Sequence, residues 1–476
     1  MDSYASFILG KTRLLLAVVL GILLNSCSTH SSRQPSALKA IRPKFDRQDL
    51  PEGLRYWISS EQDLLFLSGT STVISEDINQ QDPQFRPETK KFFELKTFWV
   101  DETKFRAFEA ANAEINPDIK KFLVRQGPQG KQYRLIVHPE SEAFYQPMLE
   151  NAVEADPVWG TPLASPRTLL IVNPKTRQAL FIAKVSLDAV VGGNVRRLIK
   201  GSEVARSVGG TQLLKSPKRP DISGAKFIEE PWGIAPIDSE KGGMIIRSLP
   251  PEVMKKQQKI LPLFALYAPR PDGQAPLMAR WIKESKMEAS DYLRAHLIAP
   301  FVKIWMEMLM KAGLTSEPHA QNVLMAVDEM EQPQKTFYFR DNGGLNFDLK
   351  HWVNTKMISS TDQLPSLNGV ETDYYQDKHS EMINLSLWKY FSEGVLIDLQ
   401  KQMILWQKKG WIKKLNGPPL EQILEEEVSK IYSAQSGKKT KFYTLFKIGT
   451  RMINLRQKLQ CEIPLSGPQP PTATSN

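Results

Sequence analysis

The sequence predicts an α+β protein in which a β-rich middle region precedes a mostly helical C-terminal region. Two patterns carry this prediction. Short apolar runs with β-branched residues and Gly or Pro punctuation are concentrated between residues 161 and 289. From residue 290 onward, apolar residues recur at helical spacing, most clearly over residues 291–312. A third observation sets one place apart, because the stretch at 317–344 carries more polar residues than a core segment would.

Composition describes an ordinary folded protein with a basic balance. The 476 residues are 41% hydrophobic and 24% charged, enough for about three domains at roughly 150 residues each. Lys and Arg number 62 against 52 Asp and Glu, a net charge of +10 that favours anionic partners such as phosphates, carboxylates or a lipid surface. No nucleic-acid-binding motif accompanies this charge, so no nucleic acid partner is expected. Two cysteines, Cys27 and Cys461, make neither a metal cluster nor a disulfide framework.

Residues 1–26 have the pattern of an export signal. Basic residues precede an apolar run at 14–24 that is too short to span a bilayer. The run ends in Leu-Asn-Ser-Cys, which resembles the lipobox of bacterial lipoproteins, so Cys27 is the predicted lipidation site. Ser28 after it favours the periplasmic side of the outer membrane. An ordinary secretory signal or a membrane-retained start is the alternative, and a misassigned N-terminus would leave the chain cytoplasmic.

Pattern and composition divide the rest of the chain into five regions. In order they are a flexible tether, a reduced N-terminal α/β region, a β-rich phosphate-binding region, a mostly helical region with the polar stretch, and a disordered tail: residues 27–50, 51–160, 161–289, 290–460 and 461–476.

Local patterns predict the individual elements. Strands are expected at residues 63–69, 92–100, 133–138, 169–172 and 179–187, and helices at 102–124, 291–312, 383–407, 420–433 and 441–459. A Pro-Lys-Thr turn between residues 169–172 and 179–187 predicts a hairpin. Residues 227–246 predict further β-structure, residues 255–267 a buried segment, and Pro300 a kink in its helix.

Hydroxyl and basic side chains gather near the ends of this hairpin. They lie on the loop before its first strand, on its second strand and on a following segment predicted to be helical: Ser165, Arg167, Thr168, Lys184 and Arg196. Hydroxyl, guanidinium and ammonium donors at neighbouring strand ends suit a triphosphate. A solvated basic face is the alternative, since residues 196–226 carry eight basic residues against two acidic ones.

The polar stretch reads E-P-H-A-Q-N, an apolar run, and then F-Y-F-R-D-N-G-G. We predict a helix that begins at residues 317–322, followed by a buried strand at 337–339 that delivers an Arg-Asp pair to its end. A helix N-terminus suits an anion, and nearby carboxylates suit a divalent metal. The alternative is a helix cap, a solvated histidine and a local Arg–Asp ion pair. The six candidates are Glu317, His319, Gln321, Asn322, Arg340 and Asp341.

Seven motifs and residues follow one another along the chain: Val-His-Pro at 137–139, S-P-R-T at 165–168, Lys184, Arg196, G-G-M-I-I-R ending at Arg247, E-P-H-A-Q-N at 317–322 and R-D-N-G-G at 340–344. In this order they resemble the NRPS-independent siderophore (NIS) synthetases of the aerobactin-synthetase type, over about residues 130 to 350 and more loosely to 460. The resemblance implies a cupped-hand architecture. It also implies an ATP-dependent ligase that converts a citrate-like carboxylate into an acyl-adenylate, which an amine or alcohol then attacks.

The resemblance assigns roles to the candidates. Nucleotide binding would fall to Ser165, Arg167, Thr168, Lys184 and Arg340. Catalytic contacts to phosphate or to the substrate carboxylate would come from His319, Arg196 and Asn322. Mg²⁺ would lie among Glu317, Gln321 and Asp341.

Two departures leave a second hypothesis open. The family's upstream Gly-His-Pro-x-His-Pro motif has its nearest counterpart in Gly-Thr-Ser-Thr at residues 69–72, without histidines. An export signal would also place the site where ATP is scarce. The chain is then a catalytically inactive, lipid-anchored relative that binds a polycarboxylate, a siderophore or a phosphorylated ligand. A structural lipoprotein on the same scaffold is a third possibility, and the sequence predicts no oligomeric state.

Overall fold

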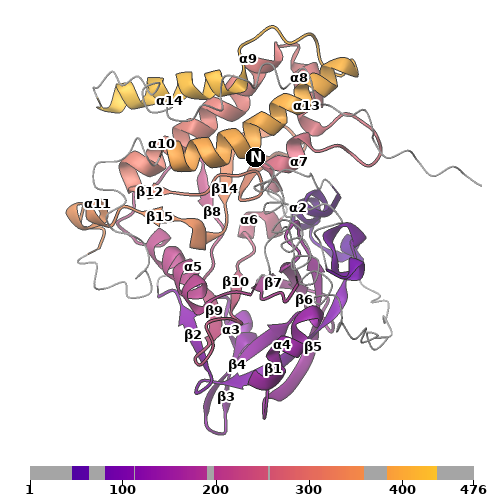
Figure 1. Ribbon diagram of the computed structural model, residues 1–476, viewed down its shortest axis with the longest axis vertical. Coiled ribbons are helices and arrows are strands. Elements are labelled where there is room, and N and C mark those ends of the chain that lie inside the picture. Colours follow the sequence, from indigo (N-terminus) through magenta and orange to yellow (C-terminus); the bar gives the residue numbers. More distant parts are fainter. Residues whose placement is uncertain are drawn as a thin grey trace, which may run out of the picture. The chain divides into compact units, whose positions relative to one another are not determined.

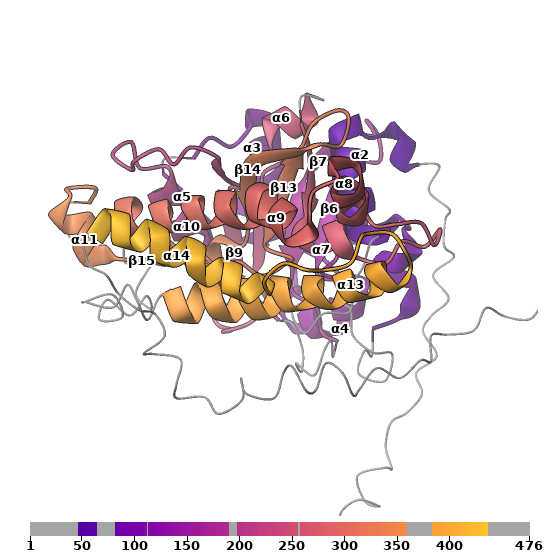
Figure 2. The same cartoon turned by 90° about the horizontal axis from the view of Figure 1, so that it is seen from above.

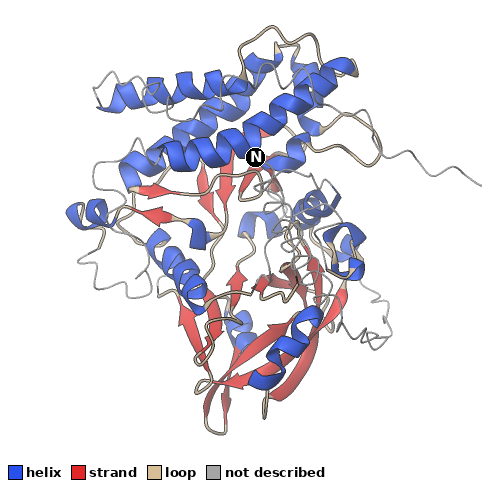
Figure 3. Cartoon of the chain, in the orientation of Figure 1, coloured by secondary structure: helices blue, strands red, loops and turns tan. Residues whose placement is uncertain are grey.

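The computed structural model describes residues 46–63, 81–111, 113–189, 198–255, 258–358 and 383–436. All of them belong to one compact unit, residues 44–476. Strands prevail up to residue 262 and helices prevail after residue 383 (Figure 3). The predicted signal peptide with Cys27, most of the strand at 63–69, Arg196, the helix at 441–459 and the C-terminal tail lie outside the described residues.

The strands are β1 (Phe93–Asp101), β2 (Phe105–Glu109), β3 (Val124–Gly127), β4 (Gly130–Val137), β5 (Val153–Pro162), β6 (Thr168–Val172), β7 (Ala179–Val185), β8 (Ala225–Phe227), β9 (Trp232–Pro236), β10 (Met244–Arg247), β11 (Lys259–Pro262), β12 (Leu314–Thr315), β13 (Val323–Val327), β14 (Pro333–Phe339) and β15 (Asn346–Phe347). The α-helices are α2 (Glu52–Asp63), α3 (Pro117–Leu123), α4 (Glu142–Tyr145), α5 (Gly201–Leu214), α6 (Pro251–Met254), α7 (Leu263–Tyr267), α8 (Leu277–Ser285), α9 (Ala289–Leu293), α10 (Ala299–Ala312), α11 (Leu349–Asn354), α13 (Ile397–Lys408) and α14 (Leu420–Ser436) (Figure 1). Two segments are π-helical: η7 (Arg294–Ile298) joins α9 to α10, and η12 (Ile383–Leu396) leads into α13. A 3₁₀ turn, η8 (Asn342–Gly344), follows β14.

Nine strands form one sheet, in the order β2-β9-β10-β7-β6-β5-β1-β4-β3, which we call the large sheet. All of its pairings are antiparallel. The predicted hairpin is confirmed, because β6 and β7 pair in register with Thr168 opposite Lys184. The sheet crosses the predicted boundary between residues 160 and 161, which falls inside β5, so strands from both predicted regions belong to one structural layer.

The two faces of the large sheet contribute to different cores because side chains alternate along a strand. On β7, Phe181, Ala183 and Val185 pack into a core that also takes residues of α3 and α4. Ile182 faces the other way, into a second core, and Lys184 follows it on the same face by the same alternation.

A second sheet of four strands, β11-β13-β14-β8, which we call the small sheet, covers part of that other face. Leu324 and Tyr338 of the small sheet pack with Ile182 of the large sheet in one cluster. The opposite face of the small sheet, including Val323 and Phe339, packs into the helical core. The seam between the two sheets therefore holds an apolar core, and Lys184 lies at its edge.

The C-terminal helices cover the small sheet. α10 packs against α14 and β14, and α13 runs beside α14 (Figure 2). The helical prediction for residues 291–312 is confirmed, but Pro300 is accommodated by a π-helical turn: Ala299 N–H donates to the oxygen of Arg294, five residues back. In the part of the chain that the structure describes, no helix is long and apolar enough to cross a membrane.

The helix predicted at residues 102–124 is wrong. β2 and α3 occupy this range, with a loop between them. Phe105 and Ala107, two residues apart, both face the core of the large sheet, and this spacing is the period of a strand. Asn116 then caps α3 by accepting from Asp118 N–H, and Pro117 occupies the first turn, so the helix begins there and no earlier.

Candidate functional site

Register brings three of the predicted and motif-bearing residues onto one face of the large sheet. Thr168 lies opposite Lys184, and Lys184 lies opposite Ile245 on β10. Arg247 is two residues beyond Ile245, so alternation directs its side chain to the same face. Thr168, Lys184 and Arg247 are all buried, which makes this a sheltered basic patch beside the seam core.

Asp341 reaches this patch from the end of β14, as the sequence predicted. Its Oδ1 accepts from Lys184 Nζ at 2.8 Å, which joins residues 157 positions apart. Its backbone is left-handed, with φ of +70°, a conformation that Asp tolerates better than most residues. Gly343 follows, where a Cβ would lie 2.7 Å from Ser207 Oγ of α5, so the turn packs closely against that helix.

Asn342 fixes this turn to the large-sheet side of the molecule. Its backbone N–H donates to Glu230 Oε2 at 2.9 Å, and its Nδ2 donates to Thr211 Oγ1 at 2.8 Å. Glu230, which is fully buried, accepts in turn from Arg247 Nε at 3.1 Å. Arg247 therefore contributes a buried ion pair that orients the loop carrying Asp341.

Arg340 lies beside Asp341 in sequence but does not pair with it, so the alternative of a local Arg–Asp ion pair is wrong. Its guanidinium forms a buried ion pair with Glu61 of α2, with Nη2 at 3.3 Å from Oε2. Glu61 also accepts from Trp57 Nε1 at 2.9 Å and from Ala164 N–H at 3.1 Å. The side chain of Arg340 thus ties β14 to α2 and to the loop that holds Ser165 and Arg167.

The prediction of a helix beginning at residues 317–322 is wrong, because the apolar run that follows is the strand β13. β13 pairs with β11 on one side and β14 on the other, and all five of its residues are buried. Residues 317–322 form a turn instead, in which Asn322 N–H donates to the oxygen of His319 at 3.0 Å. Arg340 N–H donates to the oxygen of Asn322 at 3.0 Å, so the turn lies against the start of the Asp341 loop.

His319 is held as a neutral imidazole. Its Nδ1 accepts from Gln321 N–H at 3.3 Å, which places the ring proton on Nε2. Burial lowers the pKa of His319 to about 4, so the ring stays uncharged at neutral pH. Its ring lies 6.2 Å from that of Tyr390, whose hydroxyl donates to Glu317 Oε1 at 3.1 Å.

The charges of the basic patch, of Asp341 and of Glu317 shift one another's pKa values. Burial alone would raise the pKa of Asp341, but Lys184, Arg247 and Arg167 outweigh it and hold that pKa well below its usual range. Burial, and then the charge of Asp341, raise the pKa of Glu317. Burial lowers the pKa of the half-buried Arg167, although nearby carboxylates oppose the shift.

The carboxylates suit a metal that arrives with its ligand. Among the described residues, no three His, Cys, Asp or Glu side chains come together to hold a metal ion. Mg²⁺ is commonly held by one or two carboxylates plus phosphate oxygens. Glu317 and Asp341 fit that role, since each carboxylate disfavours the charge of the other and a dication would relieve this. Gln321, four residues after Glu317 in the sequence, is buried.

Most of the predicted residues therefore lie close together, on β6, on β7, in the loop after β14 and in the turn before β13. Ser165 is half-buried in the turn before β6, where its oxygen accepts from Thr168 N–H at 2.9 Å. Sequence reasoning missed four partners: Glu61, Thr211, Glu230 and Tyr390. Glu61 had one usable signal, since it shares the buried face of α2 with Trp57 and Ile58.

No protein-family model matches the sequence, and no curated protein matches it. Solved structures do match its fold. ATP-bound aerobactin synthetase IucA from a hypervirulent pathotype of Klebsiella pneumoniae has a TM-score of 0.58 and 17% identity, over 81% of this chain and 70% of that one. The petrobactin biosynthesis protein AsbB from Bacillus anthracis str. Sterne has a TM-score of 0.58 and 19% identity, over 75% of this chain and 63% of that one.

Aerobactin synthetase IucC from the same pathotype of Klebsiella pneumoniae has a TM-score of 0.54 and 17% identity, over 77% of this chain and 68% of that one. These likenesses confirm the predicted fold class. The chain has the mixed α+β fold of the NIS synthetases, with a helical C-terminal part.

Proposed function

From this shared fold, we propose that the chain is a siderophore-synthetase-like ligase that binds ATP and Mg²⁺ and joins a citrate-like carboxylate to an amine or alcohol. The observation that carries the proposal is the meeting of Arg167, Lys184 and Asp341 with His319 and Glu317. These residues come from four places in the chain, namely the turn before β6, β7, the turn before β13 and the loop after β14, and each is of the type and in the order that the family resemblance assigns.

The chemistry has two balanced steps. A carboxylate oxygen of the acid attacks the α-phosphorus of ATP, and pyrophosphate leaves, giving an acyl-adenylate. The amine or alcohol then attacks the acyl carbon, loses a proton, and AMP leaves. Arg167 and Lys184 would hold the phosphates, and their fixed charge favours the transition state in which negative charge builds on phosphate oxygens.

Neutral His319 suits this site because its Nε2–H can donate a hydrogen bond without adding another buried charge. Thr168 and Ser165 would add hydroxyl donors near the phosphates, and Asn322 would contact phosphate or the acid. Arg196 would act with them from a segment outside the described residues. Mg²⁺, bound with ATP near Glu317, Gln321 and Asp341, would offset the negative charge of the phosphate oxygens.

A second candidate function is supported by the ion pairing. Three cations near the site are already neutralised by carboxylates of the chain: Lys184 by Asp341, Arg247 by Glu230 and Arg340 by Glu61. A phosphate must compete with Asp341 for Lys184. We therefore keep as the alternative a catalytically inactive relative that binds a polycarboxylate, a siderophore or a phosphorylated ligand.

The test is pyrophosphate release, with hydroxamate trapping of the activated acid, from the chain starting at Ser28, given ATP, Mg²⁺ and citrate. Arg167→Ala and His319→Ala should each abolish release. Arg106→Ala removes an exposed arginine of β2 and should leave it unchanged. Turnover that survives both site variants would refute the ligase at this cluster, and ligand binding that needs Arg167 without any turnover would establish the inactive relative.

We also propose that the chain is exported and anchored to the membrane through Cys27, by the signal pattern of residues 1–26. Labelled fatty acid should enter the wild-type chain and not Cys27→Ala. Incorporation into both, or into neither, would refute the lipid anchor. A cytoplasmic wild-type chain would remove the conflict between export and ATP use.

A further inference from the structure

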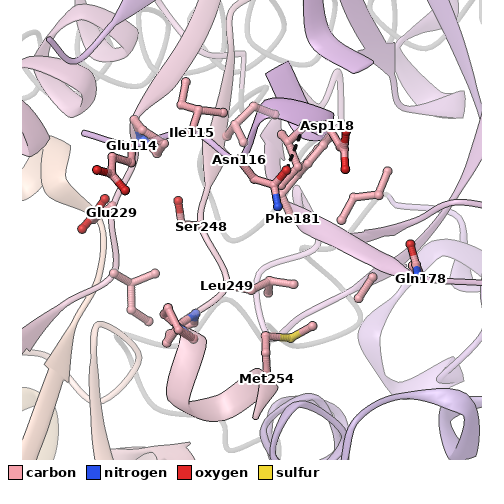
Figure 4. Close-up of a pocket in the computed structure, with 18 of the residues that line it drawn as sticks. Glu114, Ile115, Asn116, Asp118, Gln178, Phe181, Glu229, Ser248, Leu249 and Met254 are labelled. Atoms are coloured by element: carbon pink, nitrogen blue, oxygen red, sulfur yellow. Dashed lines mark hydrogen bonds between the residues drawn. The ribbon is translucent and has the colours of Figure 1, made fainter. Parts of the chain in front are cut away.

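A cavity of about 850 Å³ lies apart from the cluster described above (Figure 4). Its walls come from α3 and the loop before it, from the turn between β6 and β7, and from the segment joining β10 to α6. The volume is in the range of pockets that enclose most of a small organic ligand. None of the residues assigned above to nucleotide, acid or metal lines it.

The cavity and the cluster occupy opposite sides of the same backbone. Glu229 and Ser248 line the cavity, whereas their sequence neighbours Glu230 and Arg247 form the buried ion pair of the cluster. Ser248 N–H donates to the oxygen of Glu229 at 2.9 Å, which holds the two segments together. The cavity and the ion pair of the cluster thus use different, adjacent residues of the same two segments.

The lining joins an apolar floor to acidic walls. The floor is formed by Ile119, Phe122, Phe181, Leu249 and Met254. Four carboxylates and two lysines also line the cavity: Glu114, Asp118, Glu229, Glu252, Lys215 and Lys226. The lining thus has a net charge of −2 in a chain whose net charge is +10.

The two lysines are already neutralised. Lys215 Nζ lies 3.0 Å from Glu229 Oε1, and Lys226 Nζ lies 3.7 Å from Glu252 Oε1. Glu114 has no ion pair or hydrogen bond to its carboxylate from any residue in the described ranges. In Figure 4, Glu114, Glu229 and Ser248 lie on the same side of the cavity.

We propose that this cavity is an accessory binding site for an amphipathic primary amine. The apolar body of the ligand lies on Phe122, Phe181 and Met254, and its ammonium group binds at Glu114, with the hydroxyl of Ser248 beside it. An anion is disfavoured by the lining charge, and a neutral molecule gains no charge attraction to Glu114. The site is independent of the ligase proposed above and does not require that ATP be used.

Calorimetric titration of the full chain with n-hexylamine, n-hexanol and n-hexanoate tests this. Hexylamine should bind at least about tenfold more tightly than the other two, and added salt should weaken it. Glu114→Lys should weaken hexylamine at least about tenfold, since it turns an attraction into a repulsion. The control Glu154→Lys reverses another exposed carboxylate, on β5, and should have no effect. Both positions are exposed, so neither variant threatens the fold.

Three outcomes overturn the proposal: no heat of binding at millimolar hexylamine, equal affinity for hexanol, or hexylamine binding that Glu114→Lys leaves intact. Binding that Asp341→Asn abolishes and Glu114→Lys does not would place the amine at the reaction site instead. That result would refute the accessory site while supporting the ligase, so the two proposals can fail separately.

Discussion

The buried carboxylate of Glu61 offers the sharpest test of how the site is held. It is fully buried and accepts from Trp57, from the backbone of Ala164 and from both terminal nitrogens of Arg340. Glu61→Ala removes all four acceptor interactions and leaves the guanidinium of Arg340 buried without its counter-ion. No other carboxylate is hydrogen bonded to Arg340 among the described residues.

The expected loss is large. Removing one partner of a buried ion pair costs about 3–5 kcal/mol, because the remaining charge keeps its desolvation penalty. Two further donors, from Trp57 and Ala164, lose their acceptor at about 1 kcal/mol each where water cannot replace it. These terms share one site and do not add fully, so we expect Glu61→Ala to lower the free energy of unfolding by about 4 kcal/mol.

Urea unfolding followed by tryptophan fluorescence measures this loss, with Glu154→Ala as an exposed carboxylate control that should change stability by less than about 0.5 kcal/mol. Adding Arg340→Met to Glu61→Ala removes the stranded charge, so the double variant should cost at least about 2 kcal/mol less than the two single losses summed. A cost below about 1 kcal/mol for Glu61→Ala, or simple additivity, would refute the buried-anchor explanation.

Three further predictions concern pH and packing. The pKa of Asp341 is lower in the folded chain than its unfolded value of about 3.8, so the ionised carboxylate stabilises the fold above that pH. This stability is lost as the pH falls through the folded pKa. Asp341→Asn should therefore be less stable at pH 7, and its urea midpoints should fall less steeply in acid. Burial raises the pKa of Glu140 to about 7, so the stability it contributes below its unfolded pKa should fall by roughly 3 kcal/mol as pH rises from 4.5 to 7, and urea midpoints of Glu140→Gln should lack this slope. Gly210→Ala should destabilise by about 1–3 kcal/mol in thermal unfolding, because its Cβ would lie 2.8 Å from the backbone oxygen of Asn342, whereas Gly201→Ala in the same helix meets only an ordinary 3.4 Å contact and should not.

Local pattern was sufficient where one short-range force decides the structure. The β6–β7 hairpin follows from two apolar runs around a turn, and helical periodicity gave the long C-terminal helices. The delivery of Asp341 to a strand end was also predictable, because a buried Phe-Tyr-Phe strand ends in charged residues and glycines. Lys184 could be placed on β7 for the same reason.

Two kinds of information were not local. The run Val-Leu-Met-Ala-Val of β13 has no period, because the small sheet is covered on both faces, and such a run does not distinguish a strand from a buried helix. The ion partner of Arg340 lies 279 residues away in the chain, so no spacing rule could identify Glu61. The predicted anion site at a helix N-terminus failed for the first reason, and the expected Arg340–Asp341 pair failed for the second.

The bond between Lys184 and Asp341 joins the large sheet to the loop that leaves the small one. A triphosphate that takes Lys184 would exchange this intramolecular crosslink for one that passes through the ligand. Nucleotide binding would then change the stability of the contact between the large and the small sheet. The effect would extend beyond the side chains that touch the ligand. Hydrogen exchange of the backbone amides of β7 and β14 would detect that change even if the chain catalyses no reaction.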